Sequence, residues 1–188
     1  LTLAQNFMVP FAREYILSLG CCSASKDSFR RILRGGPGRG VIIVPGGAEE
    51  SLYAEPGSMA LVLSKRKGFV RESVLAGASL VPCVAFGENE LYRASRAEEG
   101  SRLARFQHTA LKFMGFAMPI FNGRSIFYKG GGLMPARRSV NVVVGAPIAP
   151  PPESAGLSPD SAEMREVVGR VHEQYVTALR ELYAAHKD

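Results

Sequence analysis

The sequence has few cysteines, no long apolar run and no secretory signal. Its three cysteines, two of them adjacent at Cys21 and Cys22, have neither the number nor the spacing of a disulfide framework or a metal site, which suits a reducing compartment. No segment reaches the roughly 18 consecutive apolar residues that a transmembrane helix needs. No signal peptide is visible, but the chain begins with Leu1 in what looks like mid-domain sequence, and a truncated start would hide one.

The charge of the chain is basic, with 23 Lys and Arg against 17 Asp and Glu and a net charge of +6. A basic surface suits nucleic acid, an anionic membrane or a phosphate-bearing ligand. Nucleic acid is disfavoured, because the sequence has no RNP-like or helix-turn-helix signature and its aromatic residues lie in apolar runs. We therefore expect no nucleic-acid partner.

The pattern of apolar residues predicts an α/β fold with a mixed or parallel sheet flanked by helices. With 188 residues, 46% of them hydrophobic, the chain is long enough for one domain, or for most of one. The predicted strands are residues 41–44, 80–86 and 140–144. The predicted helices are residues 7–19, 25–33, 69–76 and 101–114, and a long amphipathic helix at about 160–187 whose apolar stripe is Met164, Val168, Val171, Tyr175, Leu179 and Leu182.

Polar and glycine residues follow two of the predicted strands where each strand ends. Residues 46–51 follow strand 41–44, and the cluster 88–90 follows strand 80–86. Parallel strands would bring both groups to one edge of the sheet, where α/β folds bind ligands. For each group a solvated loop is the alternative, and it stays open at this point.

Other motifs are interpreted structurally. The glycine-rich segment 35–40 lacks the Lys-Ser/Thr ending of a phosphate-binding loop and precedes a strand, so we interpret it as a helix-to-strand turn. His108, His172 and His186 are interpreted as surface residues, because none is placed for a catalytic dyad. There is no serine nucleophile elbow and no zinc-ligand spacing, so no metal is expected.

Four segments occur in order along the chain: GGAEES, KGFVRESVLAGASLVPCVAFGENELY, FNGRSIFY and VVVGAPI. REYILSLGCCSASKDSFRRIL near the start fits the same register. Together they resemble the type-2 diacylglycerol acyltransferase family, which includes monoacylglycerol and wax-alcohol acyltransferases. The resemblance implies an enzyme of the endoplasmic-reticulum membrane, with its catalytic domain facing the cytosol and a fold akin to the wider glycerolipid acyltransferases. It would transfer a fatty acyl group from its co-substrate acyl-CoA to the hydroxyl of a neutral lipid. Diacylglycerol is the favoured acceptor, which makes the reaction a step of triacylglycerol synthesis. No cofactor is implied.

The histidine motifs that the resemblance calls for are absent. Neither the family's His-Pro-His-Gly nor the His-x-x-x-x-Asp of the wider group occurs in the chain. The resemblance places that motif before Leu1, so we expect residues 1–188 to be a single, incomplete acyltransferase domain whose N-terminal part is missing. By itself it is expected to be inactive and poorly soluble. Where phosphate-acylating relatives read Phe-Pro-Glu-Gly-Thr-Arg, residues 44–50 read Val-Pro-Gly-Gly-Ala-Glu-Glu, and the loss of the phosphate-clamping arginine fits an uncharged acceptor.

The expected reaction suggests roles for individual residues, as hypotheses. Glu50, Glu88 and Asn89 would support the upstream histidine or bind the acceptor hydroxyl, and the backbone N–H groups of Gly46 and Gly47 would stabilise the oxyanion. The residues that would meet the phosphates of acyl-CoA are Lys65, Arg66, Lys67, Arg71 and Arg124. For the basic residues around position 66, anionic lipid or a solvated face are the alternatives.

A second hypothesis is a non-catalytic lipid-binding or regulatory protein with an acyltransferase-like domain that starts near Leu1. The sequence upstream of Leu1 discriminates the two, because only the enzyme needs His-Pro-His-Gly there. The acceptor (diacylglycerol, monoacylglycerol or a long-chain alcohol) and a homo-oligomeric assembly are left open.

Overall fold

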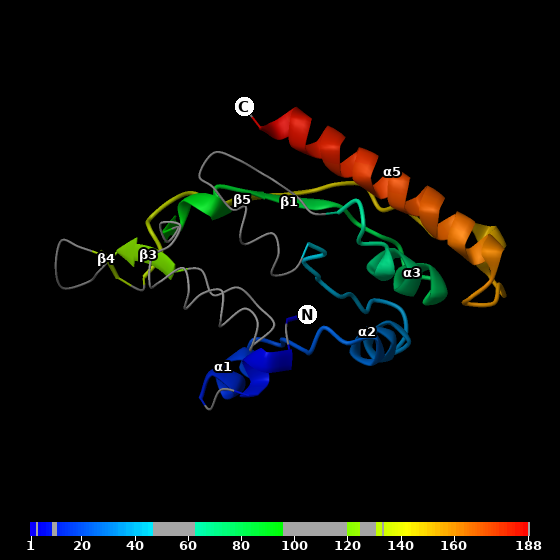
Figure 1. The fold of residues 1–188 in the computed structure, drawn as a ribbon, viewed down its shortest axis with the longest axis horizontal. Coiled ribbons are helices and arrows are strands. Elements are labelled where there is room, and N and C mark those ends of the chain that lie inside the picture. Colours follow the sequence, from blue (N-terminus) through cyan, green and yellow to red (C-terminus); the bar gives the residue numbers. More distant parts are fainter. Residues whose placement is uncertain are drawn as a thin grey trace, which may run out of the picture. The chain divides into compact units, whose positions relative to one another are not determined.

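The structure is a computed structural model that describes residues 1–2, 4–8, 11–46, 63–95, 120–124, 131–132 and 134–187. These residues belong to two compact units. The first unit is formed by Leu1–Pro45, Arg66–Val81 and Ala146–Ala178, and the second by Gly46–Lys65, Pro82–Gly145 and Leu179–Asp188. Figure 1 labels the helices and strands of both units.

Helices dominate the first unit. They are η1 (Ala4–Met8), α1 (Ala12–Ser18), α2 (Lys26–Leu33), α3 (Gly68–Leu75), η4 (Pro152–Ser154) and α5 (Ala162–His186), the last of which continues into the second unit. The predicted helix 7–19 is therefore split into η1 and α1. Phe11 lies between them with a left-handed φ of 65°, a conformation that a continuous α-helix does not contain. The predicted helix 101–114 lies outside the described residues.

Helix α2 confirms the predicted helix 25–33. The Ser25 side chain accepts a hydrogen bond from the backbone N–H of Ser28 at 3.1 Å, which satisfies one of the free donors at the start of the helix. After α2 the chain turns through Gly36 and Gly38, whose φ angles of 109° and 81° are left-handed. The glycine-rich segment is thus a turn that begins where the helix ends, as predicted, but the predicted strand does not follow it.

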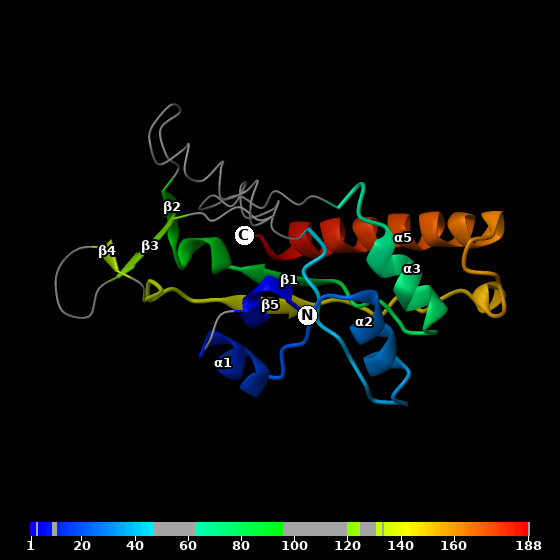
Figure 2. The same cartoon turned by 60° about the horizontal axis from the view of Figure 1, so that its bottom comes forward.

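The core of the first unit lies between α3 and the first half of α5. The buried residues of this core are Val70, Val74, Met164, Val167, Val168 and Val171. Figure 2 shows α3 alongside α5, and it also shows α2 beside α3. The predicted apolar stripe of the last helix is confirmed, since its members from Met164 to Leu179 are buried and Leu182 is half-buried. Each such valine or methionine stabilises the fold by about 1.5–3 kcal/mol.

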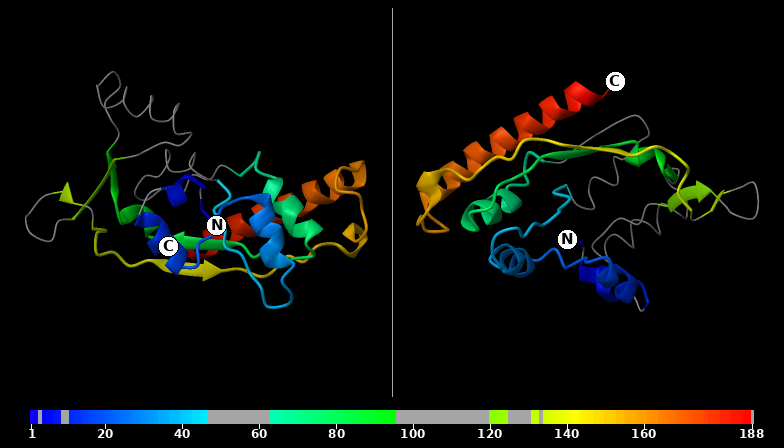
Figure 3. Two further views of the ribbon diagram at one scale, coloured as in Figure 1. Left: turned by 90° about the horizontal axis from the view of Figure 1, so that it is seen from below. Right: turned by 180° about the vertical axis from the view of Figure 1, so that it is seen from behind.

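Two antiparallel sheets form in the second unit. Strand β1 (Cys83–Phe86) pairs with β5 (Asn141–Val144), and the two run beside each other in Figure 3. Strand β3 (Ile120–Arg124) pairs with both β2 (Arg93–Ser95) and β4 (Gly131–Gly132). The predicted strand 80–86 is shortened, because Pro82 has no N–H to donate to a ladder. Its carbonyl still accepts from the N–H of Gly145 at 2.8 Å.

The prediction of a parallel sheet is not confirmed, because every paired strand in the described part of the chain is antiparallel. The only parallel contact there is an isolated bridge between Thr2 and Ser23. The predicted buried strand 41–44 is wrong: this segment has no secondary structure, and Ile42 is 87% exposed. An apolar run becomes a strand only when another strand pairs with it, and no described strand does so here. The observed fold combines helices with small antiparallel sheets.

Candidate functional site

The polar cluster after β1 forms a short 3-10 helix, η3 (Glu88–Glu90). Gly87, with a left-handed φ of 86°, turns the chain from the end of β1 into this helix. Glu88 and Glu90 are exposed and Asn89 is half-buried. The Arg138 guanidinium lies 3.8 Å from the Glu90 carboxylate. The structure thus places residues 88–90 directly after the end of β1.

The second predicted cluster is described only at its first residue. Gly46 is buried in a turn that follows Pro45. Gly47 and Glu50 lie outside the described residues, so their proposed roles stay predictions. Because residues 41–44 form no strand, the described part of the chain contains no shared sheet edge that would bring Gly46 and Glu88 together.

The basic residues predicted to meet acyl-CoA have different surroundings. Lys65, Arg66 and Lys67 are exposed immediately before α3, whose first turn contains no acidic residue. The Nη2 of Arg71 donates to Asp160 Oδ1 at 2.6 Å and to the Pro159 carbonyl at 3.0 Å. The Nε of Arg124 donates to the carbonyl oxygen of Pro135 at 3.2 Å.

The sequence analysis missed an ion pair between α2 and α3. Arg30 donates from Nε to Glu72 Oε2 at 2.6 Å and from Nη2 to Glu72 Oε1 at 2.9 Å, which is the bidentate geometry that guanidinium and carboxylate prefer. Glu72 is buried, and its hydrogen bonds and charge raise the pKa of Arg30 above its ordinary value. A lone glutamate inside the otherwise uncharged stretch after Arg71 was the one signal in the sequence, and it did not identify a partner 42 residues away.

The histidines differ from their interpretation at one position. His172 was expected on the surface but is 5% exposed, with its ring edge-on to Phe69 at a centroid distance of 6.4 Å. It follows Val168 by four positions, so the helical period places it on the buried face of α5. His186 is exposed, as predicted. His108 lies outside the described residues.

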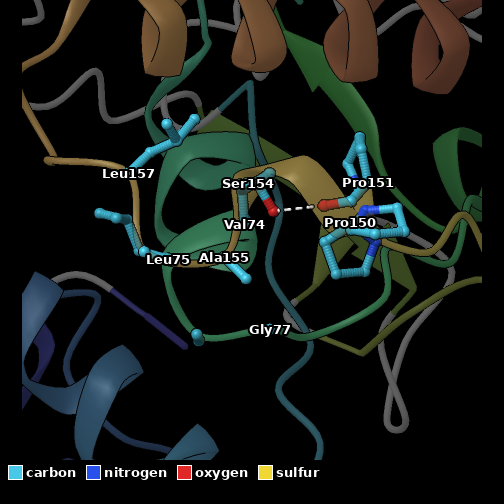
Figure 4. Close-up of a pocket in the computed structure, with 11 residues that line it drawn as sticks. Val74, Leu75, Gly77, Pro150, Pro151, Ser154, Ala155 and Leu157 are labelled. Carbon is cyan, nitrogen blue, oxygen red and sulfur yellow. Dashed lines mark hydrogen bonds between the residues drawn. The ribbon is translucent and has the colours of Figure 1, made fainter.

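A pocket of about 440 Å³ opens at the end of α3 in the first unit (Figure 4). Its wall consists of the last turn of α3, the prolines 150–152 and residues 154–157. The hydroxyl of Ser154 donates to the carbonyl of Pro151 at 2.6 Å, so it is held within the wall. None of the predicted site residues lines this pocket, and its lining contains no ionisable side chain. The pocket therefore offers apolar surface and no acid or base.

Two further properties bear on function. Within the described ranges, no three His, Cys, Asp or Glu side chains come close enough together to hold a metal ion. None of the helices that the structure describes combines the length and the apolarity needed to cross a bilayer.

Comparison with known proteins places the chain in a family. The profile described as "Diacylglycerol acyltransferase" matches residues 1–188. The chain is 45% identical over 189 residues to "Diacylglycerol O-acyltransferase 2A" of Umbelopsis ramanniana, which covers 100% of this chain and 52% of that protein. It is 44% identical over 188 residues to "Diacylglycerol O-acyltransferase 1" of Schizosaccharomyces pombe, again with 100% and 52% covered.

A relative named for a different acceptor is similarly close. The chain is 43% identical over 182 residues to "2-acylglycerol O-acyltransferase 1" of Bos taurus, with 96% of this chain and 52% of that protein covered. No solved structure gives a significant match. The chain spans about half the length of these curated relatives. The match over all 188 residues shows that the chain belongs to the diacylglycerol acyltransferase family.

Proposed function

We propose that the protein containing this chain is an acyl-CoA-dependent O-acyltransferase that acylates diacylglycerol to triacylglycerol. The observation that carries this proposal is the family match over the whole chain, with relatives of about 44% identity whose printed names are diacylglycerol O-acyltransferases. A 2-acylglycerol O-acyltransferase at 43% identity makes monoacylglycerol the competing acceptor. Both acceptors are neutral lipids with a free hydroxyl, so the chemistry is the same for either.

The reaction is direct acyl transfer. A histidine takes the proton of the acceptor hydroxyl, the oxygen attacks the thioester carbonyl, and the CoA thiolate leaves and is protonated. The chain contains no His-Pro-His-Gly, so the base is contributed by the rest of the protein, and the isolated chain is inactive. Glu88 and Asn89 support this histidine or bind the acceptor hydroxyl from their place after β1, together with Glu50.

Backbone donors stabilise the oxyanion in this proposal. A glycine pair lets the thioester approach the backbone closely, since neither residue carries a Cβ. Gly46 is buried in its turn, where a hydrogen bond to an oxyanion is shielded from water and is correspondingly strong. Gly47 supplies the second donor.

The nucleotide part of acyl-CoA is bound by basic side chains before α3. Lys65, Arg66 and Lys67 are exposed there, and their positive charge attracts an anionic ligand. Arg71 and Arg124 would first have to leave Asp160 and the Pro135 carbonyl, respectively. Arg71 and Arg124 therefore contribute to acyl-CoA binding only after their side chains rearrange, or they support the structure around the basic residues.

The cellular setting follows from the same proposal. An enzyme of this family works at the endoplasmic-reticulum membrane, with this domain on the cytosolic side, because its acceptor is dissolved in the bilayer and acyl-CoA comes from the cytosol. Residues 1–188 form one acyltransferase domain with the remaining polypeptide, which completes a mixed or parallel sheet like that of the wider glycerolipid acyltransferases. Homo-oligomerisation is compatible with this arrangement.

The test is an acyl-transfer assay on the complete protein. It would be expressed in cells that lack triacylglycerol synthesis, and membranes would be given labelled oleoyl-CoA with diacylglycerol, monoacylglycerol or hexadecanol. We expect labelled triacylglycerol, and its loss when the histidine of the family motif is replaced by alanine. Lipid binding without transfer to any acceptor would instead support the non-catalytic protein.

A further inference from the structure

Two adjacent residues of opposite charge hold α3 from two sides. Arg71 is bound to Asp160 and to the carbonyl of Pro159, in the turn before α5. Glu72 receives both hydrogen bonds of Arg30, from α2. One short helix is therefore tied to two segments that are more than 40 positions away in the sequence, and both ties lie within the first unit.

The two ties differ in their surroundings. The Glu72 side chain is 6% exposed and that of Arg30 37%, so the carboxylate lies in a largely water-free site with its partner above it. The Asp160 side chain is 87% exposed, which makes the Arg71 pair a surface contact of modest strength. The pair between Arg30 and Glu72 is the one that fixes geometry.

Apolar packing alone would leave the placement of α3 less defined. Val70 and Val74 bury their side chains against α5, but hydrophobic contact is non-directional and tolerates small rotations and shifts. A bidentate pair has a fixed plane and fixed distances. A buried ion pair stabilises a fold little better than apolar side chains of the same size would, so its more specific effect is on position.

The segment whose position is fixed in this way is the basic one. Lys67 directly precedes α3, and its carbonyl accepts a hydrogen bond from the N–H of Arg71 at 3.1 Å. Any rotation or shift of α3 therefore moves Lys67 with it. Its neighbour Arg66 is exposed on the same approach to the helix.

We propose that Arg30 and Glu72 are positioning residues for acyl-CoA binding. Their ion pair fixes α3 relative to α2, and this holds the basic residues Arg66 and Lys67, just before α3, in position to contact the phosphates of the nucleotide. Neither Arg30 nor Glu72 touches the ligand. The inference rests on the proposed function, because it assigns these basic residues to acyl-CoA, and it adds a determinant of KM that lies away from the reacting atoms.

The experiment compares two acyl donors on the complete protein in membranes. Oleoyl-CoA carries the phosphates, and S-oleoyl-pantetheine has the same thioester without them. For Glu72→Gln and Arg30→Lys we expect the KM for oleoyl-CoA to rise roughly threefold to tenfold, because a shift of Arg66 and Lys67 weakens their contacts with the phosphates. The KM for S-oleoyl-pantetheine and kcat with either donor stay within about twofold, since the reacting atoms are untouched.

Glu153→Gln is the matched control. It breaks the ion pair between Glu153 and Arg170, which is exposed on both sides, and we expect no change with either donor. The double variant Arg30→Glu with Glu72→Arg restores opposite charges, and partial recovery of the oleoyl-CoA KM supports the clamp. If Glu72→Gln does not accumulate as folded protein, Arg30→Lys carries the comparison, since Arg30 is the more exposed partner of the pair.

The outcomes separate the inference from the function on which it rests. Equal losses with both donors would mean that the pair is merely structural, and the inference would fail. Unchanged kinetics in Glu72→Gln and Arg30→Lys, with the protein folded, would overturn it too. If the unmodified protein transfers acyl groups from neither donor, the proposed function itself is wrong.

Discussion

The backbone of Gly87 lies directly against the carbonyl oxygen of Ser139. A Cβ built on Gly87 would overlap that oxygen, and it would also lie 3.4 Å from the carbonyl carbon of Ser139 and 3.8 Å from the Cα of Val140. Gly87 has a left-handed φ of 86° as well. Residue 87 therefore cannot carry a side chain without moving either the end of β1 or the segment that leads into β5.

The first prediction follows from that contact. Gly87→Ala adds a strained left-handed backbone of about 1–2 kcal/mol and overpacking of about 1–3 kcal/mol. We expect a loss of about 2–5 kcal/mol in the free energy of unfolding. Denaturant unfolding of the purified protein measures it.

Gly77→Ala is the control for this substitution. Gly77 also has a left-handed φ, of 65°, but a Cβ there would meet no atom within 4 Å among the described residues. Gly77→Ala should therefore lower the free energy of unfolding only by the backbone contribution, about 1–2 kcal/mol. Equal losses at positions 87 and 77 would show that the contact with Ser139 contributes nothing.

Local patterns in the sequence predicted the helices because helices are stabilised within one segment. The apolar stripe of α5 and the helix at 25–33 depend on residues that are only a few positions apart, and both predictions are confirmed. The segment 41–44 was misjudged because an apolar run does not identify a partner strand. The antiparallel pairing of β1 with β5 could not be predicted either, since register and direction are set by contacts across more than 50 residues.

The candidate site was predictable to a similar extent. The position of residues 88–90 directly after a strand could be predicted because a strand end is a local feature, while their role in the site stays a prediction. The family resemblance came from ordered motifs. The pair of Arg30 and Glu72 was missed because nothing local marks two distant side chains as partners. His172 was misjudged because it was interpreted from the residue type alone, which is often exposed. Its spacing of four positions from Val168 places it on the buried face of α5.

The second prediction concerns Gly169, in the middle of α5. Its φ is not left-handed, and a Cβ there would meet no atom within 4 Å in the part of the chain that the structure describes. Glycine costs about 0.5–1 kcal/mol relative to alanine inside a helix, because it loses more conformational entropy on folding. We expect Gly169→Ala to raise the free energy of unfolding by that amount, measured by thermal or denaturant unfolding.

Met164 on the same helix gives the opposite expectation. It is 1% exposed in the core between α3 and α5, so Met164→Ala leaves a cavity and should cost about 2–5 kcal/mol. Glu166→Ala, two positions further along on the exposed face, should stay within about 0.5 kcal/mol. A stability loss at Met164 no larger than that at Glu166 would contradict the packing of α3 on α5.

The basic residues just before α3 give a prediction about how the KM for oleoyl-CoA depends on salt. If Lys65 and Lys67 meet phosphates in solvent, added salt should raise the KM for oleoyl-CoA, because exposed charges are screened within about 8 Å at physiological ionic strength. Lys65→Glu with Lys67→Glu should raise that KM roughly threefold to tenfold and weaken its salt dependence. Steady-state kinetics at several salt concentrations test this. Charge reversal at Arg137, an exposed basic residue elsewhere in the chain, is the control. It should leave the KM for oleoyl-CoA and the salt dependence of that KM unchanged.

The last prediction separates the roles within the cluster after β1. Glu88 and Asn89 are proposed to orient the catalytic histidine or the acceptor hydroxyl, and misplacing a reacting group by about 1 Å costs up to roughly 100-fold in rate. We expect Glu88→Gln and Asn89→Ala each to lower kcat by roughly 10- to 100-fold while the KM for oleoyl-CoA stays within about twofold. Glu90→Gln is the matched control, because Glu90 is an exposed carboxylate of the same 3-10 helix that forms an ion pair with Arg138. Full turnover in the variants at positions 88 and 89, at normal protein levels, would remove the cluster from the site and leave Glu50 as the remaining candidate for the supporting carboxylate.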